Sequence, residues 1–276
     1  MGQWDAELIP LLPPSVRIFA SAGAGFNWAD TDLLGQHKIW YANGAGASDE
    51  AVSDTALYMI VSVFRNFTRS QLAARTTVPE IFNATHELIA SISHNPRGNI
   101  SKKLAHKART ALGMEIHCFD VVRASLDEEH RLGATFHASL DKLLKVADCI
   151  SLHTPLNAYT HDLIDARALA LMNPGSRVVN TAHGQIVDED ALVAALKSWH
   201  ISAAGLDVHY HESQVAPELA TMENVTLTTH IRGGALDTRI TFELNAMKNI
   251  LAVVGPDGEF IGESLTPVNA KAFNAA

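Results

Sequence analysis

Cysteine is scarce in this chain: its 276 residues include only Cys118 and Cys149, and both lie inside apolar runs. This count excludes the dense disulfide framework of small secreted domains. We therefore expect two buried thiols and a reducing, cytoplasmic location. Long hydrophobic runs are also absent, since none reaches the roughly 18 residues that a membrane-spanning helix needs. The first fifteen residues carry Asp5, Glu7 and three prolines, so we expect neither a signal peptide nor a membrane partner.

Positive charge is limited as well. Lys and Arg number 21 against 30 Asp and Glu, which gives a formal net charge of −9 at pH 7. A nucleic-acid partner is not expected, because such a partner requires a basic face. Hydrophobic residues make up 47% of the chain, enough for a sizeable core. The length suits two domains of roughly 100–150 residues each.

From residue 99 onward, segments with helical periodicity alternate with short apolar runs. Such alternation predicts an α/β fold with a doubly wound parallel sheet and helices on both of its faces. Before residue 99 the sequence indicates a strand at 16–20 and a long helix from 49 to about 73. The later expected helices are 101–112, 139–146, 165–172, 188–198 and 235–253, and the later expected strands are 114–119, 149–152, 177–180, 201–206 and 225–228.

Polar residues follow three of these expected strands. The segments read V-V-N-T-A-H-G, G-L-D-V-H-Y-H-E and L-T-T-H-I-R-G-G. The carboxyl ends of parallel strands meet at one edge of a sheet, so His183, Asp207, Glu212 and His230 are expected near one crevice. An imidazole beside a carboxylate is typical of a tuned proton donor.

Several longer motifs occur in a fixed order: S-A-G-A-G-F-N-W-A-D, A-S-D-E-A-V-S-D, S-L-H-T-P-L, V-V-N-T-A-H-G-Q-I-V-D-E-D-A-L, G-L-D-V and T-T-H-I-R-G-G. On these motifs the chain resembles the D-isomer-specific 2-hydroxyacid dehydrogenases from about Val16 to Asn269. The resemblance implies a Rossmann-like NAD-binding domain, residues 97–247, inserted into a smaller flavodoxin-like substrate domain, residues 1–96 plus 248–276. It also implies a homodimeric, NAD-dependent oxidoreductase that interconverts small 2-oxo acids and D-2-hydroxy acids by hydride transfer.

Position by position, the resemblance also implies a set of site residues. It makes His230 the acid/base and Glu212 its partner. Ala24 and Gly25 match a loop whose backbone amides hold the substrate carboxylate. The positions that match the family's cofactor site are Asp120, which would receive the adenosine ribose, together with Thr154, Thr181, Ala182, Asp207 and Gly233.

The choice between NAD and NADP depends on Asp120. A carboxylate at the ribose repels a 2′-phosphate, so NAD is favoured. Arg123 lies three residues later and keeps NADP open as the second option.

The sequence departs from the family pattern in three places. The strand and first glycine of the G-x-G-x-x-G turn are missing, so Gly98 and Ser101 would be its last two positions. The composition of S-H-N-P-R-G at 93–98 is typical of a linker. His183 stands where the family has its catalytic arginine, and strands that normally precede Val16 are missing. We therefore expect both domains to be incomplete and the activity to be weakened, with Arg232 as a candidate substitute for the lost arginine.

Two alternatives stay open at this point. His209 and His211 form an H-x-H pair that, with Glu212 and His230, is a candidate metal site for a hydrolase or oxygenase. The chain could instead be a degenerate dinucleotide-binding protein without catalysis. The dehydrogenase interpretation expects no metal.

Overall fold

The structure is a computed structural model that describes residues 4–26, 28–76, 92–94, 99–212 and 214–275. By its internal packing the chain divides into two compact units. The first comprises residues 1–48 and 233–276, and we call it the terminal unit. The second comprises residues 49–232, and we call it the sheet unit.

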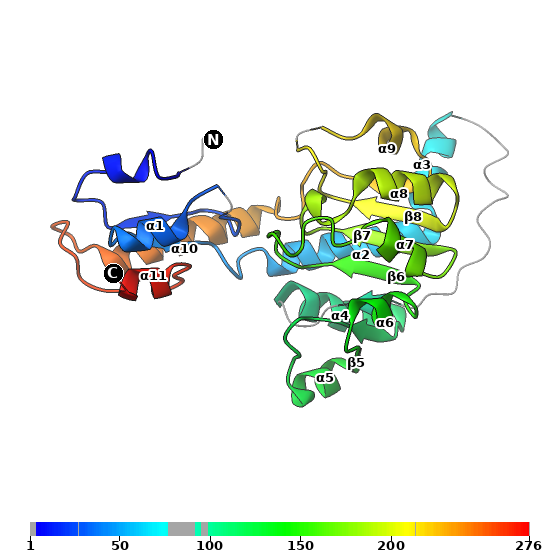
Figure 1. Ribbon diagram of the computed structural model, residues 1–276, viewed down its shortest axis with the longest axis horizontal. Coiled ribbons are helices and arrows are strands. Elements are labelled where there is room, and N and C mark those ends of the chain that lie inside the picture. Colours follow the sequence, from blue (N-terminus) through cyan, green and yellow to red (C-terminus); the bar gives the residue numbers. More distant parts are fainter. Residues whose placement is uncertain (1–3, 27, 77–91, 95–98, 213, 276) are drawn as a thin grey trace. The chain divides into compact units, whose positions relative to one another are not determined.

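A seven-stranded sheet in which every neighbouring pair is parallel forms the centre of the sheet unit, with the strand order β5-β4-β3-β6-β7-β8-β9. Figure 1 shows β6, β7 and β8 side by side in the right-hand part of the view. The parallel order places the carboxyl ends of all the strands at one edge. The strands are β3 (Ile92–His94), β4 (Ile116–Cys118), β5 (Ala134–Phe136), β6 (Cys149–Leu152), β7 (Ser176–Asn180), β8 (Ile201–Leu206) and β9 (Val225–Leu227).

Helices cover both faces of this sheet, with α8 on one face and α2 on the other (Figure 1). Several of them begin at a Ser or Asp whose side chain accepts a hydrogen bond from the first turn, as at Ser125, Ser139, Asp165 and Asp188. The helices of this unit are α2 (Asp49–Arg65), α3 (Phe67–Thr76), α4 (Asn99–Leu112), α5 (Leu126–Leu132), α6 (Leu140–Leu144), α7 (Ala166–Leu171), α8 (Glu189–Lys197) and α9 (Pro217–Thr221).

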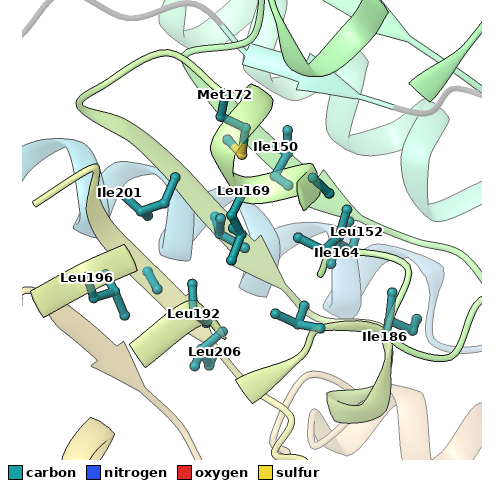
Figure 2. Close-up of a cluster of buried hydrophobic side chains, with 14 of the residues drawn as sticks. Ile150, Leu152, Ile164, Leu169, Met172, Ile186, Leu192, Leu196, Ile201 and Leu206 are labelled. Carbon is teal, nitrogen blue, oxygen red and sulfur yellow. The ribbon is translucent and has the colours of Figure 1, made fainter. Parts of the chain in front are cut away.

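The alternation of side chains along each strand produces two separate cores. Ile150 and Leu206 point to one face and pack with Leu192 and Leu196 of α8, as Figure 2 shows. Cys149, Val179 and Ala203 point to the other face and pack with residues of α2 and α4. A sheet buried on both faces needs nearly continuous apolar strands, and the expected runs at 149–152 and 201–206 are confirmed with identical bounds.

The terminal unit contains a two-stranded parallel sheet, one helix of 18 residues and several short helices. Its elements are η1 (Ile9–Leu11), β1 (Ile18–Ala20), α1 (Thr31–Gln36), β2 (Trp40–Ala42), α10 (Leu236–Val253) and α11 (Ala270–Ala275). Asn269 connects the C-terminal part of this unit to its N-terminal part by side-chain hydrogen bonds. Its side chain accepts from the Tyr41 amide at 2.9 Å and donates to the Thr31 and Ile39 carbonyl oxygens at 3.0 Å.

Two expectations need correction. The long helix expected over 49–73 is interrupted at Asn66, whose φ of 50° lies in the left-handed region, so that α2 ends at Arg65 and α3 begins at Phe67. Asparagine tolerates this conformation better than most residues, which explains the break.

The missing central strand is the second and larger correction. Residues 92–94 form β3 and pair with β4 on one side, Ile92 opposite Ile116, and with β6 on the other, Ser93 opposite Ile150. The prediction that this position is vacant was wrong, as was the linker interpretation of residues 93 and 94. An empty position here would leave the facing backbone groups of β4 and β6 without partners, and the short polar segment satisfies them.

The division by packing differs from the expected substrate and cofactor domains, since α2 and α3 belong to the sheet unit. The functional assignment of 97–247 to the cofactor and the remainder to the substrate stays a prediction. Across the part of the chain that the structure describes, no helix combines the length and apolar character that crossing a membrane demands.

Candidate functional site

His230 and Glu212 meet beyond the carboxyl edge of the sheet. The Nδ1 atom of His230 lies 2.6 Å from Oε2 of Glu212, and both side chains are about two-fifths exposed, at 43% and 41%. His230 has a φ of 58°, a left-handed conformation that is uncommon outside glycine. Its backbone amide donates to the Asp207 carbonyl oxygen at 2.8 Å. The structure therefore brings the two residues together as expected, while their catalytic roles stay predictions.

Asp207 holds the loop that carries His230. Its side chain is fully buried, at 0% exposure. One oxygen, Oδ1, accepts from Thr228 Oγ1 at 2.5 Å and from the Ile231 amide at 2.9 Å, and Oδ2 accepts from the Arg232 amide at 3.0 Å. A buried carboxylate with three donors is well satisfied, so it fixes the path of residues 228–232.

His183 lies between β7 and the short helix η3 (Gly184–Ile186) and is partly buried. Burial lowers its pKa, and the charges of Arg232 and His230 lower it further, against the opposing effect of Glu212. The ring is therefore neutral near pH 7 and offers a single N–H donor. An arginine at this position would offer a charged fork of donors instead.

The loop after β8 packs directly on η3. A Cβ atom added at Gly184 would lie 1.9 Å from the His209 carbonyl oxygen, so only glycine fits there. His209 is 7% exposed and its Nε2 lies 2.9 Å from the Thr228 carbonyl oxygen, which makes it a donor to that oxygen. A metal ion needs only one ring nitrogen of a histidine, and Nδ1 of His209 is buried without a hydrogen-bond partner in the described structure.

The surroundings of His209 do not favour the metal alternative. His211 is exposed, and no cluster of three or more His, Cys, Asp or Glu residues suited to a metal ion occurs among the described residues.

The expected cofactor residues follow three strands of the sheet at the same edge. Asp120 comes after β4, Thr154 after β6, and Thr181 and Ala182 after β7. Thr181 is 2% exposed, and its hydroxyl is buried without a hydrogen-bond partner in the described structure. The Oγ atom of Ser101, in the first turn of α4, is likewise buried without a hydrogen-bond partner in the described structure.

Orphaned hydroxyls and a helix N-terminus at the carboxyl edge suit a polar ligand with phosphates, so these residues fit a dinucleotide. Gly98, the other expected turn position, lies outside the described residues. Gly233 belongs to the terminal unit, where a Cβ added to it would lie 3.8 Å from Ser48 Cβ.

Arg123 is already engaged by a neighbouring carboxylate. Its Nε and Nη2 each donate to one oxygen of Glu129 at 2.7 Å, and its guanidinium lies 4.8 Å from the centroid of the Phe136 ring. Asp120 accepts from the Val122 amide at 3.2 Å through Oδ1. The argument that kept NADP open is thereby weakened, because the guanidinium already has a buried partner.

The glycine-rich turns at 21–25 and 43–46 are tied together in the terminal unit. Asn43 Nδ2 donates to the Ala24 carbonyl oxygen at 2.8 Å, and the Gly44 amide donates to the Gly23 carbonyl oxygen at 2.9 Å. A Cβ added at Gly25 would meet nothing within 4 Å, so the backbone there is open to a ligand. Sequence reasoning missed Asn43, for which the only signal was a turn-forming residue before glycine.

Comparison with known proteins agrees with this arrangement. The family model described as the NAD binding domain of D-isomer specific 2-hydroxyacid dehydrogenases matches residues 96–232. A protein of Schizosaccharomyces pombe that carries the name 2-hydroxyacid dehydrogenase is 32% identical over 259 residues, which cover 91% of this chain and 74% of that protein.

Solved structures are similar over most of the chain. The holo form of D-mandelate dehydrogenase from Rhodotorula graminis is 44% identical with a TM-score of 0.89, over 96% of this chain and 79% of that one. A glyoxylate reductase from Paecilomyes thermophila is 31% identical with a TM-score of 0.87, over 97% and 80%. A D-lactate dehydrogenase from Aquifex aeolicus, complexed with NAD and lactic acid, is 26% identical with a TM-score of 0.79, over 94% and 84%.

Proposed function

The chain belongs to the D-isomer-specific 2-hydroxyacid dehydrogenases, which are NAD-binding oxidoreductases, and from this premise we propose how its residues divide the reaction. The enzyme reduces a small 2-oxo acid to the D-2-hydroxy acid with NADH, and it runs the reverse reaction with NAD. When bound, the cofactor supplies or accepts the hydride at carbon 2. The pairing of His230 with Glu212 is the observation that carries the proposal.

His230 is the proton donor in the reductive direction. Glu212 holds Nδ1, so Nε2 is the atom that exchanges a proton with the oxygen on carbon 2. As the hydride adds to that carbon, the C=O double bond becomes a C–O single bond and its oxygen takes the proton from Nε2. In the oxidative direction, the same nitrogen removes the hydroxyl proton.

The loop at Ala24 and Gly25 holds the substrate carboxylate through backbone amides. The loop is fixed by the Asn43 bond to the Ala24 carbonyl oxygen, and space is open before Gly25. Backbone N–H groups that a ligand can approach closely suit an anion.

The 2-oxo acid carries an aromatic side chain in our proposal. Phe26 directly follows the carboxylate loop, is 42% exposed and packs edge-on against Tyr41 with ring centroids 6.4 Å apart. An exposed aromatic ring anchored in this way is a suitable partner for an apolar or aromatic group. The 44% identical D-mandelate dehydrogenase acts on a 2-hydroxy acid of this kind.

The test is the rate of NADH oxidation with a panel of 2-oxo acids, from glyoxylate to phenylglyoxylate. We expect turnover in the wild type, highest with aromatic substrates, and its loss in His230→Asn. His106→Asn, an exposed histidine on α4, is the matched control and should keep full activity. NADH binding without turnover of any 2-oxo acid would favour the degenerate binding protein. Activity that survives in His230→Asn would remove the acid/base assignment.

We further propose that the enzyme is a cytoplasmic homodimer. The location is supported by Cys118 and Cys149, which are buried thiols rather than members of a disulfide. The dimer rests on the family alone. Light scattering of the purified protein tests the dimer, and fractionation of the source cells tests the location.

A further inference from the structure

Arg232 is a partly buried cation without an ion pair among the described residues. Its Nη1 atom is buried and has no hydrogen-bond partner in the described structure. None of the ion pairs within 4 Å that the described residues form includes its guanidinium. Leaving a charged donor buried and unsatisfied is costly, so such a group calls for a ligand.

The nearest acids are engaged elsewhere. Asp207 uses its carboxylate on Thr228 and on two backbone amides, one of them that of Arg232. Glu212 uses Oε2 on His230. Both acids still act on Arg232 through space, since they oppose the fall in its pKa that burial causes. The guanidinium therefore stays charged while donors in its planar fork remain unused.

His183 lies within electrostatic reach of Arg232. The positive charge of Arg232 helps to lower the pKa of this histidine, as does burial. A neutral imidazole with one donor cannot replace the charged fork that the resemblance places at position 183. Position 183 therefore carries no positive charge, and the nearby positive charge is that of Arg232, on the loop after β9.

We infer that Arg232 binds the carboxylate of the 2-oxo acid in place of the arginine that this chain lacks at His183. The inference rests on the proposed function. It adds a substrate-binding residue that is two positions from the proton donor, on a loop that the Asp207 carboxylate holds at 2.9 and 3.0 Å. A fork and a proton donor on one fixed loop would orient the substrate for transfer.

The experiment compares Arg232→Gln, His183→Arg and the double variant with the wild type, using 2-oxo acid reduction and NADH binding. Arg232→Gln should lower kcat/KM by roughly 10²–10³, the loss expected for one transition-state donor, and should leave NADH affinity unchanged. His183→Arg in the Arg232→Gln background should recover kcat/KM at least about tenfold, because it returns a guanidinium fork to the position where the family has its arginine. Arg167→Gln removes an exposed arginine paired with Asp141 at 3.0 Å and is the matched control.

Arg232→Lys guards against a variant that fails to fold, since it keeps the charge but loses the bidentate fork. It should keep the wild-type melting temperature and still lower kcat/KM. If Arg232→Gln or the folded Arg232→Lys matches the wild type in kcat/KM, the inference is wrong.

A binding measurement separates this inference from the proposed function. Calorimetry with oxamate, an unreactive 2-oxo acid mimic, on protein saturated with NADH does not depend on turnover. If the wild type reduces no 2-oxo acid, the proposed function fails, yet oxamate binding that disappears in Arg232→Gln still supports an anion site at Arg232. Equal oxamate binding in both proteins, or none in the wild type, overturns the inference.

Discussion

Asp207→Asn should destabilise the sheet unit although it changes almost no volume. The carboxylate accepts three hydrogen bonds, two at Oδ1 and one at Oδ2, and is completely buried. An amide has only one oxygen, so its NH₂ group must face either the Arg232 amide or the two donors at Oδ1. At least one charge-assisted hydrogen bond is lost, which costs roughly 1.5–3 kcal/mol, and two donors then oppose each other.

The expected loss of unfolding free energy is therefore about 2–4 kcal/mol. At roughly 2–4 °C per kcal/mol for a unit of this size, the melting temperature should fall by about 4–16 °C. Activity should fall as well, because the loop carrying His230 loses its anchor. The measurements are calorimetric melting and urea unfolding, with NADH oxidation as the functional readout.

Asp188→Asn provides the control. Asp188 caps α8 and accepts one hydrogen bond, from the Ala191 amide at 3.1 Å. Asparagine caps a helix about as well as aspartate, so this change should cost less than about 0.5 kcal/mol. Equal stability of Asp207→Asn and Asp188→Asn would refute the reasoning, because it would mean that the buried carboxylate does not hold the loop.

Three further predictions concern the same unit. Gly184→Ala should lower stability by roughly 1–3 kcal/mol in urea unfolding, because the new Cβ would sit 1.9 Å from the His209 carbonyl oxygen; a stable variant would mean that the two loops separate easily. Both cysteine thiols have their pKa raised to about 12, mainly by burial, so below that pH they should not react with a thiol reagent until urea unfolds the chain, and rapid labelling of native protein would contradict this. Arg123→Ala should leave the preference for NADH over NADPH unchanged within about twofold, because the guanidinium is committed to Glu129, and a shift in that preference would show that Arg123 meets the cofactor.

The sequence by itself determined most of the α/β architecture. Strands at 149–152 and 201–206 have the expected bounds because a strand buried on both faces reads as a continuous apolar run, which is a local property. The helices α4, α7, α8 and α10 follow in the same way from periodicity, and α7 and α8 also begin at a capping Asp. The ordered motifs predicted that His230 and Glu212 would meet, and they lie 2.6 Å apart.

Only the tertiary structure decided what depends on distant partners. Residues 92–94 lack the apolar pattern of a buried strand. They form β3 because they supply hydrogen-bond partners to the backbone groups of β4 and β6, which would otherwise have none. His209 donates to the Thr228 carbonyl oxygen and Arg123 is held by Glu129. Two residues that the sequence offered as binding candidates therefore form structural contacts. Arg232 was already a candidate from the sequence, and the structure adds that its Nη1 atom is a buried donor without a hydrogen-bond partner among the described residues. Burial and non-local hydrogen bonding, which no short window of sequence encodes, set these roles.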